Sequence, residues 1–126
     1  MARRWVTGWK LDLTDRERLL ARFPPLFPGV IADHVTLRTG TNDSTPLPSE
    51  RAGEVVGEID DTRGVQALVV SIGGTTARAD GSTYHITWSL DRAAGRRAVE
   101  SNHVIAELGW RWLPELVPIR LNPARF

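Results

Sequence analysis

The sequence of 126 residues contains no cysteine, a single lysine, a single tyrosine and no long uninterrupted apolar run. The lack of cysteine excludes disulfide bonds, thiolate catalysis and cysteine-based zinc sites within the chain. It also fits a reducing compartment, and we expect the cytoplasm. Because no segment reaches the roughly 20 apolar residues of a membrane-spanning helix, and the first residues lack the apolar core of a secretory signal, we expect no membrane partner.

Neither sign of charge is in excess, because 16 basic residues face 15 acidic ones. Bulk charge therefore predicts no attraction to nucleic acid. Lys10 is the only lysine, so the other basic residues are arginines, which suit bidentate phosphate contacts; codon bias in a GC-rich genome would produce the same pattern. The length and the 41% of hydrophobic residues predict one globular domain, residues 1–126, which we expect to be a monomer.

The pattern of apolar and turn-forming residues predicts an α+β domain with two helices over a mostly antiparallel sheet. Strands are expected at residues 4–9 (as a short edge strand), 30–38, 54–60, 65–72, 84–90 and 115–121, the last ended by Pro123. Residues 67–72 are apolar almost throughout, as in a central strand covered on both faces. Polar or glycine-rich loops are expected at 40–53, 73–82 and 91–97.

Two helices are expected between these strands. The first covers about 15–22, because Thr14 and Glu17 have the spacing of a capping box with Thr14 as N-cap. The second begins at 98 or 101 and ends at 108, where Gly109 supplies the C-terminal stop.

Two of the three histidines stand at the head of the same pattern, His-x-Thr between apolar residues: Asp33-His34-Val35-Thr36-Leu37-Arg38 and Tyr84-His85-Ile86-Thr87-Trp88-Ser89. Side chains alternate between the two faces of a strand. The expected polar faces are therefore His34, Thr36 and Arg38 on one strand, and His85, Thr87 and Ser89 on the other. The expected apolar faces are Val35 and Leu37, and Ile86, Trp88 and Leu90.

Two such strands lying side by side would place two imidazoles and two hydroxyls around one anion. A neutral imidazole can take a proton from an attacking water, while a protonated one gives a proton to the departing alkoxide. The hydroxyls of Thr36 and Thr87 can donate to the non-bridging oxygens of a phosphate. The pattern thus predicts a metal-independent phosphodiesterase with His34 and His85 as its catalytic pair.

The paired motifs resemble the signature of the 2H phosphoesterase superfamily, which includes bacterial RNA 2′,5′-ligase-like proteins, plant cyclic phosphodiesterases and the phosphodiesterase domain of fungal tRNA ligases. The stretch 81–90 and the later Glu100-Ser101-Asn102 are most similar to that last group and its small bacterial relatives. The distance between the two motifs is short for the superfamily, so substrate-recognising elaborations are expected to be trimmed.

The resemblance implies a compact two-lobed fold with the active site in the cleft between the lobes. It implies hydrolysis of 2′,3′-cyclic phosphates, either on RNA ends or in small cyclic nucleotides, without a cofactor or metal. It also implies that His34 and His85 exchange protons and that Thr36 and Thr87 hold the phosphate.

Other residues have competing interpretations. Arg38 and Arg78 are candidate phosphate ligands, against a rim salt bridge for the first and a solvated loop charge for the second. Tyr84 and Trp88 could stack on a base, but alternation points them to the core. Ser101 and Asn102 are better explained as N-caps.

The remaining candidates are weaker. Asp33 could complete a two-histidine, one-carboxylate metal site, but directly before His34 in a strand it would face the wrong way. His103 is expected to be structural or exposed, and Trp110 and Trp112 are expected in the core or at an edge.

Two alternatives to an enzyme stay open. A non-catalytic nucleotide- or phosphate-binding module would keep the site without turnover. A structural or interaction domain would bury both motifs, and each histidine would then matter for stability alone.

Overall fold

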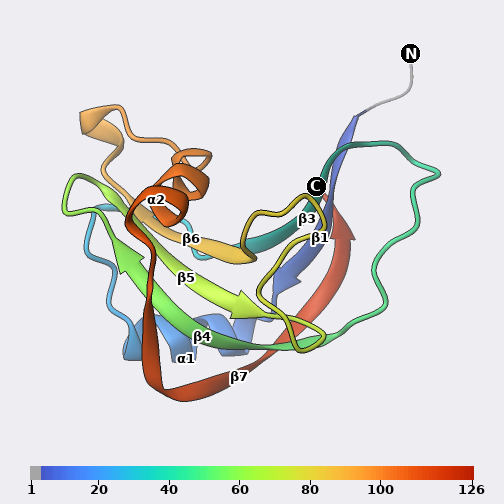
Figure 1. Ribbon diagram of the computed structural model, residues 1–126, viewed down its shortest axis with the longest axis horizontal. Helices are drawn as coiled ribbons and strands as arrows, with labels where there is room; N and C mark the ends of the chain where they lie inside the picture. The colour runs from blue at the N-terminus through green and yellow to red at the C-terminus, as the bar shows by residue number, and fades with distance from the viewer. Residues whose placement is uncertain (1–3) are drawn as a thin grey trace.

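The computed structural model describes residues 4–126 as one seven-stranded sheet with two α-helices (Figure 1). The elements are β1 (Trp5–Leu11), α1 (Leu13–Arg22), β2 (Gly29–Val30), β3 (His34–Thr41), β4 (Ala52–Asp60), β5 (Val65–Ser71), β6 (His85–Leu90), α2 (Glu100–Leu108) and β7 (Arg111–Arg125), with a 3₁₀ turn at Arg92–Ala94. The α+β class, the two helices and the antiparallel sheet are confirmed.

The strand order is β2-β6-β5-β4-β7-β1-β3, and every neighbouring pair is antiparallel. β7 pairs with β4 along its earlier part and with β1 along its last residues, so it joins the two halves of the sheet. The expectation that residues 4–9 form an edge strand is therefore wrong. β7 continues through Pro123, which lies opposite Trp9, because a proline removes only its own donor and leaves the rest of the ladder intact.

The predicted strand at 30–38 is in fact two strands, and they belong to opposite edges of the sheet. β2 pairs with β6, and the N–H groups of Ile31 and Ala32 still donate to the carbonyls of Trp88 and Thr87 (2.9 and 3.0 Å). Ala32 then adopts φ 46°, which turns the chain, and β3 begins at His34 and pairs with β1. One short segment thus spans both edges, and the curled sheet brings β3 into contact with β6.

The main core fills the inside of this curl. Its fully buried members include Trp9, Val35, Leu68, Ile86 and Trp88. Leu19 of α1 belongs to the same cluster, whereas Ile105 of α2 packs in a smaller cluster against β4 and β5. Figure 1 shows the two helices on opposite sides of the sheet. β5 is buried from Val65 to Val70, as predicted for a central strand.

A bulge in β6 breaks the expected alternation. Gln66 pairs with Ser89, but Ala67 pairs with Thr87, so Trp88 is an extra residue on β6. Ser89 therefore leaves the face of His85, and its hydroxyl donates to Gln66 Oε1 (2.6 Å). Leu90 correspondingly leaves the main core and packs in a cluster on the other face. Sequence alternation was wrong for these two residues, because it assumes a regular strand.

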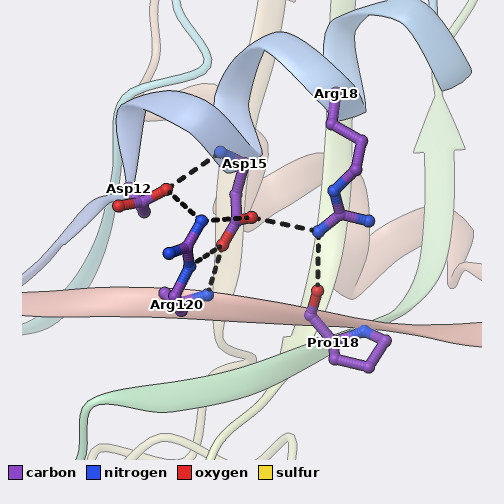
Figure 2. Close-up of polar contacts among 5 residues, drawn as sticks. All are labelled: Asp12, Asp15, Arg18, Pro118 and Arg120. Carbon is purple, nitrogen blue, oxygen red and sulfur yellow. Dashed lines mark hydrogen bonds and ion pairs between the residues drawn. The ribbon is translucent and has the colours of Figure 1, made fainter.

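The first helix is capped differently from the prediction. Asp12, rather than Thr14, is the N-cap, and its carboxylate accepts from the Asp15 N–H (3.0 Å). Asp15 is then buried, with its side chain only 7% exposed. Its carboxylate accepts from the backbone N–H and the guanidinium of Arg120 on β7 (2.7 and 3.2 Å) and from Arg18 (3.2 Å) (Figure 2). This ion cluster fastens α1 to the strand that joins the two halves.

The C-terminal elements agree in part with expectation. α2 begins at Glu100 without a side-chain cap and ends at Gly109, which has φ 72°. The last strand is much longer than residues 115–121 and contains Pro118 and Pro123 within its ladder.

Candidate active site

His34 lies at the first position of β3. This strand forms one edge of the sheet and contacts β6, which lies next to the opposite edge. The Nδ1 of His34 is 3.0 Å from Asp33 Oδ2, its ring packs on Phe126 with centroids 4.6 Å apart, and the side chain remains 31% exposed. A Cβ at Gly8 would lie 2.2 Å from the Val35 carbonyl oxygen. The glycine therefore allows β3 to approach β1 closely enough to be held in this position.

The expectation that Asp33 faces away from His34 is wrong. Asp33 precedes the first residue of β3, so strand alternation does not apply to it. Its carboxylate also accepts from Lys10 Nζ (2.5 Å). Burial would raise the pKa of Asp33, but the hydrogen bonds and charges of Lys10 and His34 outweigh burial and lower it. Asp33 is thus an ionised carboxylate that orients the His34 ring.

His85 begins β6 and is only 9% exposed. Its Nδ1 lies 2.9 Å from the Thr83 carbonyl oxygen. A carbonyl oxygen can only accept, so Nδ1 carries the hydrogen and the neutral ring has its lone pair on Nε2. Burial lowers the pKa of His85; the bond to Thr83 opposes this shift, and the charges of Arg78 and His34 add to it. The strands that begin at His34 and His85, β3 and β6, contact each other.

Arg78 is buried between the two motifs rather than solvated in its loop. Its guanidinium donates to the Thr36 carbonyl (3.2 Å), Asn102 Oδ1 (3.1 Å) and Ser82 Oγ (2.7 Å). Asp80 accepts a longer bond (3.3 Å), and its own pKa is lowered to about 2, mainly by hydrogen bonds from Ser82. These bonds use one N–H on each terminal nitrogen, so within residues 4–126 each terminal nitrogen keeps a second N–H for a ligand.

The two threonines differ in their surroundings. Thr36 is partly exposed, and within the described part of the chain its hydroxyl has no hydrogen-bond partner. Thr87 is 7% exposed, and its hydroxyl lies 2.9 Å from Ser101 Oγ and 3.4 Å from the Ala98 carbonyl. Thr36 is thus free to donate to a ligand, whereas the Thr87 hydroxyl first has to break its hydrogen bond to the Ala98 carbonyl.

Ser101 and Asn102 have a role that the sequence did not reveal. Ser101 is fully buried against Thr87, and Asn102 binds Arg78. Neither is the N-cap, which is Val99. The prediction that both are helix caps is therefore wrong, and the first turn of α2 holds two residues of the candidate site in place.

The other sequence candidates lie outside this arrangement. Arg38 is exposed, as is His103 on α2. Arg38 pairs with Thr7 while Thr36 pairs with Gly8, so a bulge at Leu37 takes Arg38 off the face that it was expected to share with His34. Tyr84 and Trp88 are core residues, as alternation predicted. Trp110 is partly buried and contacts Trp112, which is 68% exposed.

Two surface grooves lie near α2. The larger, about 720 Å³, is lined by charged residues of both signs, among them Asp60, Asp61, Arg63 and Arg96, and it contains neither motif histidine. The smaller, about 240 Å³, adjoins the candidate site, because Ser82, Thr83 and Asn102 line it. We therefore place the candidate site at the junction of β3, β6 and α2 and not in the larger groove.

Within residues 4–126 no group of three or more histidine, aspartate or glutamate side chains is arranged to hold a metal ion. None of the helices in that part of the chain is long and apolar enough to cross a membrane. No family model matches the chain, and neither a curated protein nor a solved structure is significantly similar to it.

Proposed function

We propose that this protein is a metal-independent phosphodiesterase of the 2H type that hydrolyses 2′,3′-cyclic phosphates of RNA ends or nucleotides. The observation that carries the proposal is that β3, which begins at His34, contacts β6, which begins at His85, and that Arg78 in the loop before β6 donates to the Thr36 carbonyl of the first motif. In this proposal the two lobes are the halves joined by β7. One contains β1 and β3, the other contains β4, β5 and β6, and the cleft lies where β3 meets β6.

The surroundings of the two histidines differ, and we base the proposed roles on this difference. His85 is buried beside the cationic Arg78, which favours its neutral form and leaves Nε2 free to accept a proton. His34 has Asp33 at its Nδ1, which orients the ring and leaves His34 as the member of the pair available to donate a proton. We therefore assign His85 as the general base and His34 as the general acid.

In the proposed reaction, the two histidines move one proton each while water opens the cyclic phosphate. His85 takes a proton from water as the water oxygen bonds to phosphorus, and the bond from phosphorus to one ribose oxygen breaks. His34 gives its proton to that oxygen, so the product is a phosphomonoester with a free hydroxyl. The free N–H groups of Arg78 and the Thr36 hydroxyl would stabilise the charge that develops on the non-bridging oxygens.

The test is hydrolysis of a nucleoside 2′,3′-cyclic phosphate in the presence of EDTA, followed by ³¹P NMR. We expect turnover by the wild type and a loss of at least about 100-fold in His34→Ala and His85→Asn, the size of a general acid–base contribution. The asparagine keeps a donor for the Thr83 carbonyl, so that variant separates activity from folding. His103→Ala, the exposed third histidine, is the matched control and should retain full activity. Turnover that survives both site variants would contradict the proposal.

A second function is favoured by one observation: the Thr87 hydroxyl is engaged by Ser101 and Ala98, and His85 is almost fully buried. A nucleotide- or phosphate-binding module would need no mobile hydroxyl and no proton exchange. Binding of the cyclic nucleotide by calorimetry, without any hydrolysis over a day, would identify that module instead of the enzyme.

A further inference from the structure

The smaller groove beside the candidate site combines apolar and polar walls. It runs between residues 81–83 and α2, where Asn102, Ile105 and Ala106 form its helical side and Trp110 follows at the end of the helix. Its volume of about 240 Å³ is open to solvent along the exposed Ala106. It therefore suits a small planar group better than a peptide segment.

Trp110 is held rigidly in the wall of this groove. A Cβ at Gly57 would lie 2.1 Å from the indole Cε3, so the ring packs directly on the backbone of β4. Its other neighbour is Trp112, whose ring centroid lies 4.6 Å away at an interplanar angle of 56°. A fixed aromatic ring loses little entropy when a ligand packs against it, which favours binding.

The groove is continuous with the residues that position the candidate site. Asn102 and Ser82 line it and also hold Arg78, while Thr83 lines it and holds His85 through its carbonyl. A ligand spanning both regions would carry an anion at one end and an apolar, aromatic group at the other. None of the described residues that line the larger groove holds Arg78 or His85, so an anion bound there would lie apart from the candidate site.

We propose that this groove binds the heterocyclic base of the nucleotide whose phosphate lies between His34, Arg78 and His85. The inference rests on the proposed function, and it adds that the protein recognises nucleotides rather than phosphodiesters in general. Ile105, Ala106 and Trp110 provide the apolar surface against which the base packs, and the Asn102 side chain lies at the edge nearest the phosphate.

The first test compares two substrates in two variants. Ala106→Phe fills the groove from an exposed helical position, and Glu107→Phe, the next residue, faces the larger groove as a matched control. For a nucleoside 2′,3′-cyclic phosphate, Ala106→Phe should lower kcat/KM about tenfold, the size of one base-stacking contribution. For the base-free 1-O-methylribose 2′,3′-cyclic phosphate it should change nothing, and Glu107→Phe should affect neither substrate. Equal effects of Ala106→Phe on both substrates, or none on either, would overturn the inference.

The second test needs no turnover, so it separates this inference from the proposed function. The five tryptophans give indole N–H signals in a ¹H–¹⁵N spectrum, and Trp110→Phe assigns one of them. Titration with a nucleoside 3′-monophosphate should shift the Trp110 signal, whereas inorganic phosphate should leave it in place. A shift without hydrolysis would support the base site while rejecting the enzyme. No shift with the nucleotide at saturation would overturn the base site, whatever the activity.

Discussion

Arg78 donates a hydrogen bond of 3.2 Å to the carbonyl oxygen of Thr36, which ties the loop before the second motif to the strand of the first. The bond joins parts of the chain that come from the two halves of the sheet. Because Arg78 also binds Asn102 on α2, one guanidinium positions three elements at once. The relative placement of the two histidines therefore depends on a residue outside both motifs.

Replacing Arg78 should impair the reaction more than replacing any exposed arginine. We expect Arg78→Ala to lower kcat/KM by about 10- to 100-fold, the range for one or two charge-assisted hydrogen bonds. Arg78→Lys should recover only part of that loss, because an ammonium cannot replace the fork of donors. Arg38→Ala, whose side chain is exposed, should change kcat/KM less than about threefold. Steady-state kinetics measure all three, and equal losses in Arg38→Ala and Arg78→Ala would contradict the assignment.

Asp33 should act on the reaction through His34. In Asp33→Asn the ring loses its ionised partner at 3.0 Å, so we expect kcat to fall about tenfold or more while KM changes little. Long-range ¹H–¹⁵N correlation of the neutral His34 ring should show a mixture of tautomers in place of the Nδ1–H form. An unchanged tautomer together with an unchanged kcat would show that the contact has no positioning role.

The pH dependence of the reaction should reveal the buried histidine. Burial lowers the pKa of His85 below its ordinary value of 6.5, so the acid limb of kcat/KM, on which the base becomes protonated, should be centred below pH 6.5. An acid limb centred above pH 6.5 would contradict the assignment of His85 as the base.

The same shift predicts a dependence of stability on pH. The unfolded chain binds a proton more readily than folded His85, so stability is complete above pH 6.5 and falls as the pH drops from there toward the lowered pKa. His85→Asn should remove this slope. Thermal unfolding between pH 7 and 5 measures this slope. Carboxylates with lowered pKa values, such as Asp15, change the stability mainly at lower pH, near and below their ordinary pKa of 3.8.

The ion cluster between α1 and β7 should contribute to stability and not to chemistry. Asp15→Ala leaves the partly buried backbone N–H of Arg120 without its acceptor, and we expect a loss of about 2 kcal/mol, typical of a hydrogen bond to a charged group. Glu17→Ala, an exposed acidic residue on the same helix, should cost less than about 0.5 kcal/mol. Urea unfolding measures both, and similar values for the two variants would contradict the role of Asp15.

Local patterns predicted the elements well where the chain is regular. The hairpin of β4 and β5, the buried β5 and the stop at Gly109 follow from apolar runs and turn residues. The break at Ala32 was not predictable, because an alanine at positive φ has no sequence signal and is held there by its bonds to β6. The bulge at Trp88 is set by pairing with β5, which no single strand encodes.

The candidate site was predicted as a list of residues but not as an arrangement. The His-x-Thr pattern identified His34 and His85, and alternation placed Val35 and Ile86 in the core. The roles of Asp33, Ser101 and Asn102 depend on contacts between distant elements, which spacing along the chain does not show. One signal was available for Asp33: a carboxylate directly before the first residue of a strand is free to turn back toward that residue.

The long last strand has a consequence for how the two histidines stay aligned. β7 is hydrogen-bonded to β4 on one side and to β1 on the other, so it sets the offset between the half that carries β6 and the half that carries β3. Deleting one residue between Val117 and Leu121 would slip that offset and turn alternate side chains to the wrong face. Proton donor and proton acceptor would then be misaligned by a change in a strand that contains neither of them.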